Sequence, residues 1–547
     1  MRIHFKSELL EFLSSEGPKE LKHMAALSVF VGITNTLLIG LINAAAKDVS
    51  AGNGVTIEFF GFVLLLLIFL IVTKRANQAN IRSANNLIYR FKIRIMNNAF
   101  KSNLLKIDRV GRDYIMEVMT RDTQFVTNSV SALVSAFQSC STLLFLTIYM
   151  GTVSLAACLI ILATAIVVFS VGLFELFKLT DQLQKESVKE AHVNGIYGSF
   201  LNGYKEIKMN SKRALDITRE MIAESKRNNE SRTYLVLKIT NFFNYLQIML
   251  YLVVGLIIFV VPVVSSSFAA HVTTAATTAL FLASSLSAVI MNIPTLSLAN
   301  VSARTLMELS RQLASHETDR VEPGETEFSD VESITLENVT YTHGGTESKK
   351  PFVLGPIDYT FEAGKVYFIR GDNGSGKTTL MRILIGLYQA GSGRILVNGE
   401  QVAEPVNASY RNLFSVVFTD FYLFKRLYGI PPFEEEEATE LLKFFKMENK
   451  VSIEDGAFSD LNFSTGQRKR LALIVALLEK RQFIILDEWA ADQDPEFRQV
   501  FYEQIIPKLK EMGKTVIAIT HDDQYYGLAD QMIYMSNGKP VNGRENV

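Results

Sequence analysis

The run GDNGSGKTTL at residues 371–380 has the residue types and spacing of a phosphate-binding turn. It follows the apolar run KVYFIR and precedes TTLMRILIGLY, which predicts a strand, a glycine-rich turn and a helix in that order. In this setting, backbone N–H groups and the helix N-terminus face nucleotide phosphates, the Lys377 ammonium neutralises phosphate oxygens, and the Thr378 hydroxyl binds Mg²⁺. The expected nucleotide-binding residues of the turn are Gly371, Asn373, Gly374, Ser375, Gly376, Lys377, Thr378 and Thr379.

A second chemical feature is the segment QFIILDEWAADQD, in which an apolar run ends in two carboxylates. We expect Asp487 to hold Mg²⁺ and Glu488 to polarise a water that attacks the terminal phosphate. Two adjacent carboxylates alone are a weak signal. Together with the phosphate-binding turn they indicate ATP hydrolysis.

The chain that must position these groups has 547 residues, which predicts two or three domains. Its net charge of −1 provides no overall positive field, so we expect no nucleic-acid partner. Hydrophobic residues make up 48% of the sequence and are concentrated before residue 305. The first half is therefore expected to lie in a lipid bilayer. Cys140 and Cys158 stand in apolar runs and are expected to be buried thiols.

Apolar runs long enough to span a membrane as helices occur throughout the first half. Six are predicted, at residues 24–46, 57–73, 129–150, 152–177, 242–264 and 272–298. Lys and Arg gather after the second and fourth of these runs, which places those connections and both termini on the cytoplasmic side. The polar start of the chain is expected to form a helix at the membrane surface.

The two inner connections, about 74–128 and 178–241, are charged and nearly free of Gly and Pro. Such long connections are better explained as helices that continue out of the membrane than as loops. Each is expected to reverse direction near a glycine, within residues 104–114 and 200–210.

A polar segment with Pro and Gly separates the two halves. The expected organisation is a transmembrane domain at 1–311, a linker at 312–330 and a nucleotide-binding domain at 331–547. In the last of these, strand-like runs such as SITLENVTY and KTVIAIT alternate with helical runs, which predicts an α/β fold with nucleotide chemistry at strand ends.

The run FSTGQRKRLAL at residues 463–473 resembles the signature motif of ABC ATPases. With the phosphate-binding turn, ILDE, AADQD and ITHDD, this resemblance covers the whole second half. Six spans with long inner helices before such a domain are similar to an ABC exporter half-transporter. The resemblance implies an all-α, six-helix transmembrane domain of the type I exporter fold, followed by an α/β P-loop ATPase domain. The runs FTDFYLF and LDEWAADQDP resemble those of the branch that exports cyclic peptides, peptide siderophores and their precursors.

The resemblance further implies ATP and Mg²⁺ as cofactors and a homodimer in which two ATP molecules lie between two ATPase domains. Glu488 and His521 would be the catalytic residues, and Asp494 resembles the aspartate that couples the two sites. The signature residues expected to contact the partner's ATP are Ser464, Thr465, Gly466 and Gln467.

Two positions depart from the family pattern. The position where the family has an aromatic ring that stacks on adenine is His343, with Tyr341 two residues earlier, and either ring can stack on a base. The glutamine that contacts magnesium is replaced by Thr419. Either Thr419 or Asp420 is expected to take over the contact with the metal, unless water mediates it.

The predicted function is ATP-driven export of a cyclic or modified peptide, with antimicrobial peptides and siderophores as examples, across the cytoplasmic membrane of a bacterium. A multidrug exporter or a lipid flippase is the alternative. A nutrient importer is disfavoured because importers of this superfamily usually keep membrane subunits and ATPases on separate chains. A channel or receptor gated by ATP would lack the coupling of hydrolysis to transport.

Overall fold

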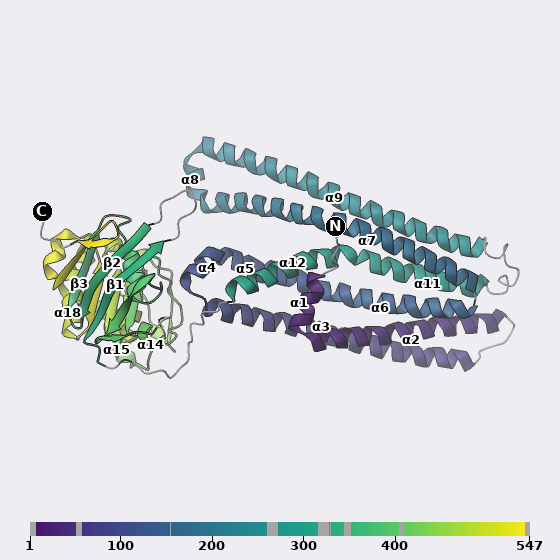
Figure 1. The fold of residues 1–547 in the computed structure, drawn as a ribbon, viewed down its shortest axis with the longest axis horizontal. Helices are drawn as coiled ribbons and strands as arrows, with labels where there is room; N and C mark the ends of the chain where they lie inside the picture. Colours follow the sequence, from purple (N-terminus) through teal and green to yellow (C-terminus); the bar gives the residue numbers. More distant parts are fainter. Residues whose placement is uncertain are drawn as a thin grey trace. The chain divides into compact units, whose positions relative to one another are not determined.

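The computed structural model describes residues 7–50, 57–153, 155–259, 272–314, 328, 330–343, 352–403, 406 and 408–541. The chain forms two compact units, and Figure 1 shows long helices in one and strands in the other. The helical unit comprises Met1–Asn98 and Val110–Ala314, and the second comprises Ala99–Arg109 and Ser315–Val547. A short piece of the first half of the sequence therefore folds with the second half.

The helices of the first half follow one another with short breaks. They are α1 (Glu8–Glu16), α2 (Pro18–Ser50), α3 (Ile57–Phe100), α4 (Leu104–Val110), α5 (Arg112–Glu117), α6 (Thr123–Val153), α7 (Leu155–Asn202), α8 (Tyr204–Met209), α9 (Ser211–Phe259), α11 (Val272–Met291) and α12 (Ile293–Leu313). A π-helical turn at Val118–Asp122 joins α5 to α6. The inner connections are helical, as predicted, because α3, α7 and α9 continue without a break for 44, 48 and 49 residues.

The chain reverses at the two places that the sequence indicated, but through short helices rather than loops. Gly111 separates α4 from α5 with a φ of 89°, a backbone conformation that side chains disfavour. Gly203 stands between α7 and the single-turn helix α8.

Five helical segments among the described residues are long and apolar enough to cross a membrane. They are Pro18–Ala45, Phe59–Phe100, Arg112–Thr152, Ser211–Leu256 and Thr274–Leu313. The predicted span at 152–177 includes residue 154 and many side chains outside the described part, and the one at 242–264 continues past the last described residue of α9. The chain is thus a multi-pass membrane protein by the length and composition of its helices.

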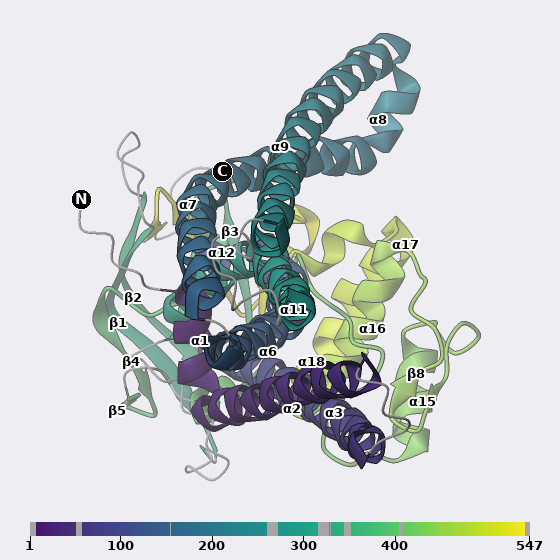
Figure 2. The same ribbon diagram turned by 90° about the vertical axis from the view of Figure 1, so that its right-hand side faces the viewer.

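Helix α6 lies at the centre of the helical unit, where it packs against α2, α11 and α12, while α7 pairs with α9 (Figure 2). A close approach of α2 to α6 occurs at Gly32, where an added Cβ would lie 2.3 Å from the Ser141 hydroxyl oxygen. That hydroxyl donates a hydrogen bond to the Val29 carbonyl at 3.2 Å. Small residues at this crossing let the two backbones meet.

The second unit contains two main sheets. The strands of the first half of this unit are β1 (Ser333–His343), β2 (Phe352–Glu362), β3 (Val366–Gly371), β4 (Ser392–Val397), β5 (Glu400–Gln401) and β6 (Phe414–Val417). The later strands are β7 (Ile453–Glu454), β8 (Ala457–Phe458), β9 (Phe483–Asp487), β10 (Thr515–Ile519), β11 (Gln531–Ser536) and β12 (Lys539–Val541). One sheet has the order β2-β1-β4-β5 and the other β12-β11-β3-β10-β9-β6, while β7 and β8 form a separate hairpin.

Helices pack on this second, mainly parallel sheet. They are α13 (Lys377–Leu384), α14 (Ala408–Arg411), α15 (Glu435–Phe444), α16 (Thr465–Leu478), α17 (Pro495–Val500) and α18 (Ile506–Glu511). Parallel strands covered by helices confirm the predicted α/β fold. Leu104 and Leu105 of α4 also pack against the apolar core of this unit.

Candidate ATP-binding and hydrolysis site

Three neighbouring parallel strands bring the predicted chemical groups to one edge of the sheet. Strand β10 pairs with β3 on one side and β9 on the other, with Ile519 opposite both Ile369 and Asp487. The residues that follow these strand ends are the phosphate-binding turn, Glu488 and Thr520 with His521. The carboxyl edge of a parallel sheet is where α/β proteins bind ligands.

The phosphate-binding turn curls around the side chain of Lys377. The Lys377 ammonium donates to the carbonyl oxygens of Gly371 at 2.7 Å and Asp372 at 3.1 Å, and Lys377 is only 6% exposed. Gly376, the N-cap of α13, has a φ of 101°. The turn thus favours glycine at this position for its backbone conformation. Thr378 and Thr379 follow, half-buried, in the first turn of α13.

Two buried oxygen atoms at this edge have no hydrogen-bond partner among the described residues, namely Ser375 Oγ and Asp487 Oδ1. Burial raises the pKa of Asp487, which is only 3% exposed, above the usual range of a carboxyl group. A buried carboxylate with an unused oxygen fits a cation, and a buried hydroxyl in a glycine-rich turn at a helix N-terminus fits a phosphate. The residues present therefore fit a nucleotide with a divalent metal ion.

At the position where the family has glutamine, this chain has Thr419, which contacts the segment that carries Asp487. Its hydroxyl donates to the Asp487 carbonyl at 3.1 Å, and hydrogen bonding by Thr419 opposes the effect of burial on the pKa of Asp487. Asp420 is exposed. The geometry thus brings Thr419 to the site.

Glu488 begins the segment after β9 in a left-handed conformation, with a φ of 49°, and its N–H donates to the Ile519 carbonyl at 3.1 Å. This conformation is rare for a residue with a side chain, and such strain concentrates at functional sites. His521 Nε2 lies 3.6 Å from Glu488 Oε1. Both residues line a cavity of about 260 Å³ together with Arg498 and Asp522. The structure thus brings the two predicted catalytic residues together.

The two aromatic candidates for adenine binding have different surroundings. The Tyr341 ring is buried and stacks on Tyr388, with 5.3 Å between ring centroids and 21° between planes. His343, at the end of β1, is exposed. The face of Tyr341 is already covered by another ring, so His343 is the ring that remains accessible to a base.

The signature run forms the start of α16. Ser464 caps the helix in a reciprocal capping box with Gln467, and Thr465 is the first helical residue. A Cβ at Gly466 would lie 2.4 Å from the Asp492 carbonyl oxygen, so this position too requires glycine. Within the described residues, the hydrogen bonds of the signature lie in its own turn or run to Gln493, and none reaches the phosphate-binding turn.

Two basic residues after the signature were missed by the sequence analysis. The fully buried Lys469 ammonium donates to the Glu488 carbonyl at 2.8 Å and lies 2.7 Å from an Asp492 carboxylate oxygen. Arg470 donates to Gln493 at 2.9 Å and to Asp494 at 2.8 Å. These contacts fix the signature helix to the segment that carries Glu488.

Asp494 also caps α17, where its carboxylate accepts from the Phe497 N–H at 2.8 Å. This backbone hydrogen bond, with Arg470 in support, holds the pKa of Asp494 below its usual range. The run of basic residues Arg468, Lys469 and Arg470 beside the apolar part of the helix indicates that buried charges there need partners, but not which partners.

Comparison with known proteins agrees with this site. Residues 354–491 match the family described as ABC transporter. Over 528 residues the chain is 30% identical to the ATP-binding protein SyrD of Pseudomonas syringae pv. syringae, covering 93% of this chain and 91% of that protein. A second relative, the energy-coupling factor transporter ATP-binding protein EcfA1 of Thermotoga maritima, is 32% identical over 216 residues, 38% of this chain and 79% of that protein.

Among solved structures, a bacterial Atm1-family ABC exporter with ATP bound has the same fold. The TM-score is 0.77 at 16% identity, and the match covers 96% of this chain and 95% of that one. The chain therefore belongs to the ABC transporter family. It is an ABC exporter half-transporter, with membrane helices and an ATP-binding domain on one chain that couples ATP hydrolysis to transport.

Proposed function

We propose that this protein exports a cyclic or modified peptide from the bacterial cytoplasm across the inner membrane, as a homodimer driven by ATP. The observation that carries the choice of cargo is the chemistry of the polar groups buried between the membrane helices, which apart from Asp122 are uncharged amides and hydroxyls among the described residues. Asn43, for example, is 5% exposed, accepts from Thr277 at 2.5 Å and donates to Thr278 at 3.3 Å. Neutral polar surroundings suit a peptide better than a lipid tail.

In the proposed ATPase cycle, Lys377 and the backbone of the phosphate-binding turn hold the β- and γ-phosphates. Thr378, Asp487 and Thr419 would hold Mg²⁺, directly or through water, and this ion would supply positive charge against the phosphate oxygens. Glu488 takes a proton from the attacking water. His521, 3.6 Å from Glu488, orients that water or the terminal phosphate.

The signature supports the proposed homodimer. Ser464 and Thr465 are exposed at the N-terminus of α16, an end that favours anions. We assign their ligand as the γ-phosphate held by the partner subunit. In this arrangement both termini lie on the cytoplasmic side, with the ATPase domains, and the cargo enters from that side.

Transport by inside-out membrane vesicles tests the proposal. Vesicles that contain the protein should accumulate a cyclic peptide when ATP is added outside, and vesicles with Glu488→Gln should not. Accumulation in right-side-out vesicles loaded with ATP would instead show import. Mass spectrometry of what a deletion strain fails to release then identifies the natural cargo.

Reconstitution of the protein in liposomes distinguishes peptide export from the lipid flippase alternative. Movement of labelled phospholipid between leaflets without peptide transport would replace the peptide proposal. Movement of many unrelated apolar drugs at similar rates would favour a multidrug exporter.

A further inference from the structure

A cavity of about 490 Å³ lies between α3 and α6, inside the helical unit. Its lining is rich in primary amides, contributed by Asn77, Asn80, Asn85, Asn128 and Gln138. Three hydroxyl side chains complete its polar surface, and none of the described lining residues carries a charge. We call this cavity the amide pocket.

Asn80 is the residue that makes the amide pocket unusual. It is only 4% exposed, and neither its Oδ1 nor its Nδ2 has a hydrogen-bond partner among the described residues. The buried Nε2 of Gln138, across the pocket on α6, is also without a partner. Leaving such groups unpaired costs about 1–3 kcal/mol each, so a molecule that enters the pocket and hydrogen-bonds to them would be stabilised there.

The chemistry of the pocket matches a peptide bond. A primary amide has both donors and an acceptor, which complement the C=O and N–H of a peptide group. A phosphate or carboxylate would call for Arg, Lys or open backbone N–H groups, and an ammonium would call for a carboxylate. The absence of charge among the described lining residues therefore favours a neutral ligand with many amides.

The position of the pocket along the helices suits cargo that arrives from the cytoplasm. Residues 57–73 form the predicted span of α3, Lys74 and Arg75 follow it, and the amides begin at Asn77. The pocket thus begins where the positive flank indicates the cytoplasmic end of the span. An apolar cluster that includes Ala84 and Val130 lies beside it and can contact apolar side chains of the same ligand.

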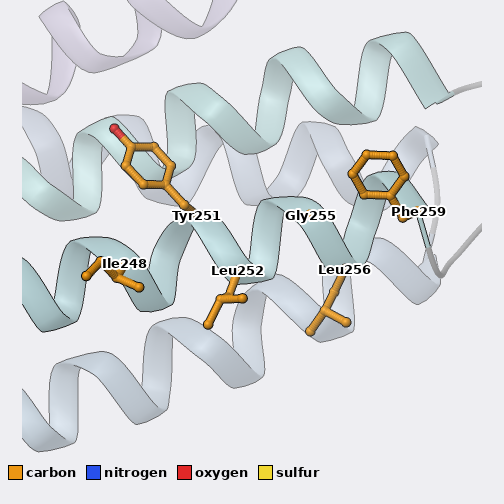
Figure 3. A pocket seen from close by; sticks show the side chains of 6 residues that line it. All are labelled: Ile248, Tyr251, Leu252, Gly255, Leu256 and Phe259. Carbon is orange, nitrogen blue, oxygen red and sulfur yellow. The ribbon is translucent and has the colours of Figure 1, made fainter.

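A second cavity, of about 520 Å³, offers a comparison within the same unit. Figure 3 shows that its described lining residues all come from α9, between Ile248 and Phe259, and that the Tyr251 hydroxyl is the only side-chain polar group among these six. That hydroxyl already accepts from Gln247 at 3.3 Å. The part of this surface that the structure describes is suited to apolar contact.

We infer that the amide pocket binds peptide groups of the cargo, with Asn80 and Gln138 as its hydrogen-bonding residues. The inference rests on the proposed peptide export and specifies the site at which the peptide backbone is recognised. It predicts that recognition depends on the ligand's backbone N–H groups, whereas sequence and charge at the side chains matter less.

The test uses the full-length protein in lipid nanodiscs and a matched pair of ligands. One is a cyclic hexapeptide of serine, leucine and alanine, and the other is the same ring with every backbone N–H replaced by N–CH₃. The concentration of each that gives half-maximal stimulation of ATPase activity is measured. For the wild type we expect a value about ten-fold lower for the unmethylated ring, the effect of one or two hydrogen bonds.

Asn80→Leu should reduce this preference to less than about two-fold, because the apolar side chain can bond neither ring. Tyr251→Phe, which removes a hydroxyl from the cavity on α9, should retain the wild-type preference. The melting temperature of Asn80→Leu should stay equal to or exceed that of the wild type, since the change removes an unpaired buried amide. A clear fall would show a structural role for Asn80 and contradict the inference.

The outcomes separate the site from the function on which it rests. If neither ring stimulates the wild type or enters vesicles, peptide export fails and the amide pocket with it. If both rings act equally on the wild type, or if Asn80→Leu keeps the full preference, the pocket assignment alone is overturned.

Discussion

The ATPase site and the amide pocket both leave some buried polar atoms without a partner among the described residues, but only the ATPase site adds buried charges that are paired within the chain. Beside Glu488, the buried cation Lys469 has an anionic partner and a carbonyl within 2.8 Å. In the amide pocket, Asn80 is buried, and neither of its amide atoms has a partner in the part of the chain that the structure describes. The ATPase site must hold a fixed geometry for one reaction, and charges paired within the chain provide it. A cargo site must release what it binds, and neutral groups without internal partners suit that need.

The first test of this comparison concerns ATP hydrolysis. Glu488→Gln removes the proposed base while leaving the phosphate-binding turn intact, so ATP hydrolysis should fall at least about 100-fold with little change in ATP binding. Phosphate release and nucleotide binding by the purified protein measure the two effects. Turnover within about two-fold of the wild type would show that another group is the base.

Lys377→Ala tests the fixed charge in the phosphate-binding turn. It removes the ammonium that faces the phosphates and also leaves the Gly371 and Asp372 carbonyls without their donor. ATP affinity should weaken about 10- to 100-fold, the effect of losing charge-assisted hydrogen bonds. Titration with a fluorescent ATP analogue provides the measurement. Lys480→Ala, in an exposed ion pair with Glu437, is the matched control and should bind ATP normally.

Lys469→Met tests whether a buried internal pair positions Glu488. The substitution keeps an apolar stem of similar length but leaves the Glu488 carbonyl and Asp492 without the ammonium. We expect kcat for ATP to fall about ten-fold with KM nearly unchanged, equivalent to about 1.4 kcal/mol.

Two further variants sharpen the Lys469 result. Lys469→Gln, which keeps a donor, should recover part of the activity. Lys446→Met, which breaks an exposed pair with Glu496, should behave as wild type. An equal loss in kcat for both methionine variants would argue against a positioning role for Lys469.

Thr419→Ala and Asp420→Ala test the smallest difference, between neighbouring residues. Because the Thr419 hydroxyl bonds the Asp487 carbonyl, the first change should lower ATPase activity about three- to ten-fold and the second less. Activity measured over a range of Mg²⁺ concentrations should show a higher requirement for Thr419→Ala. A larger effect at Asp420 would assign the metal contact to its carboxylate instead.

Local sequence signals were sufficient for much of this fold and site. The glycine spacing of the phosphate-binding turn, the apolar strand before Asp487 and the charged inner helices with few Gly and no Pro each fix a local conformation. The structure shows the turn, the strand and the helices. Contacts with residues from distant parts of the chain decide the points that local sequence patterns leave open. Tyr341 and His343 are two residues apart and share a strand face. The alternation of side chains along a strand therefore does not distinguish which of the two is accessible. Tyr388, from a distant part of the chain, covers only the first.

The same reason explains the residues that sequence reasoning missed. A charge pair such as Lys469 with Asp492 joins positions on two elements, and nothing in either element alone reports its partner. The amide pocket is another case, because α3 and α6 are each unremarkable amphipathic segments until they lie together. Contacts between elements are set by packing, which local patterns do not encode.

The assignment of residues 99–109 to the second unit has a practical consequence for dissecting the protein. An ATPase domain produced alone from residue 315 onward would lack Leu104 and Leu105, whose side chains cover part of its apolar core. The exposed patch would make such a fragment prone to self-association, and each uncovered leucine would cost up to about 1.5–3 kcal/mol of stability. Fusing residues 99–109 to a soluble fragment through a flexible linker should therefore increase its stability.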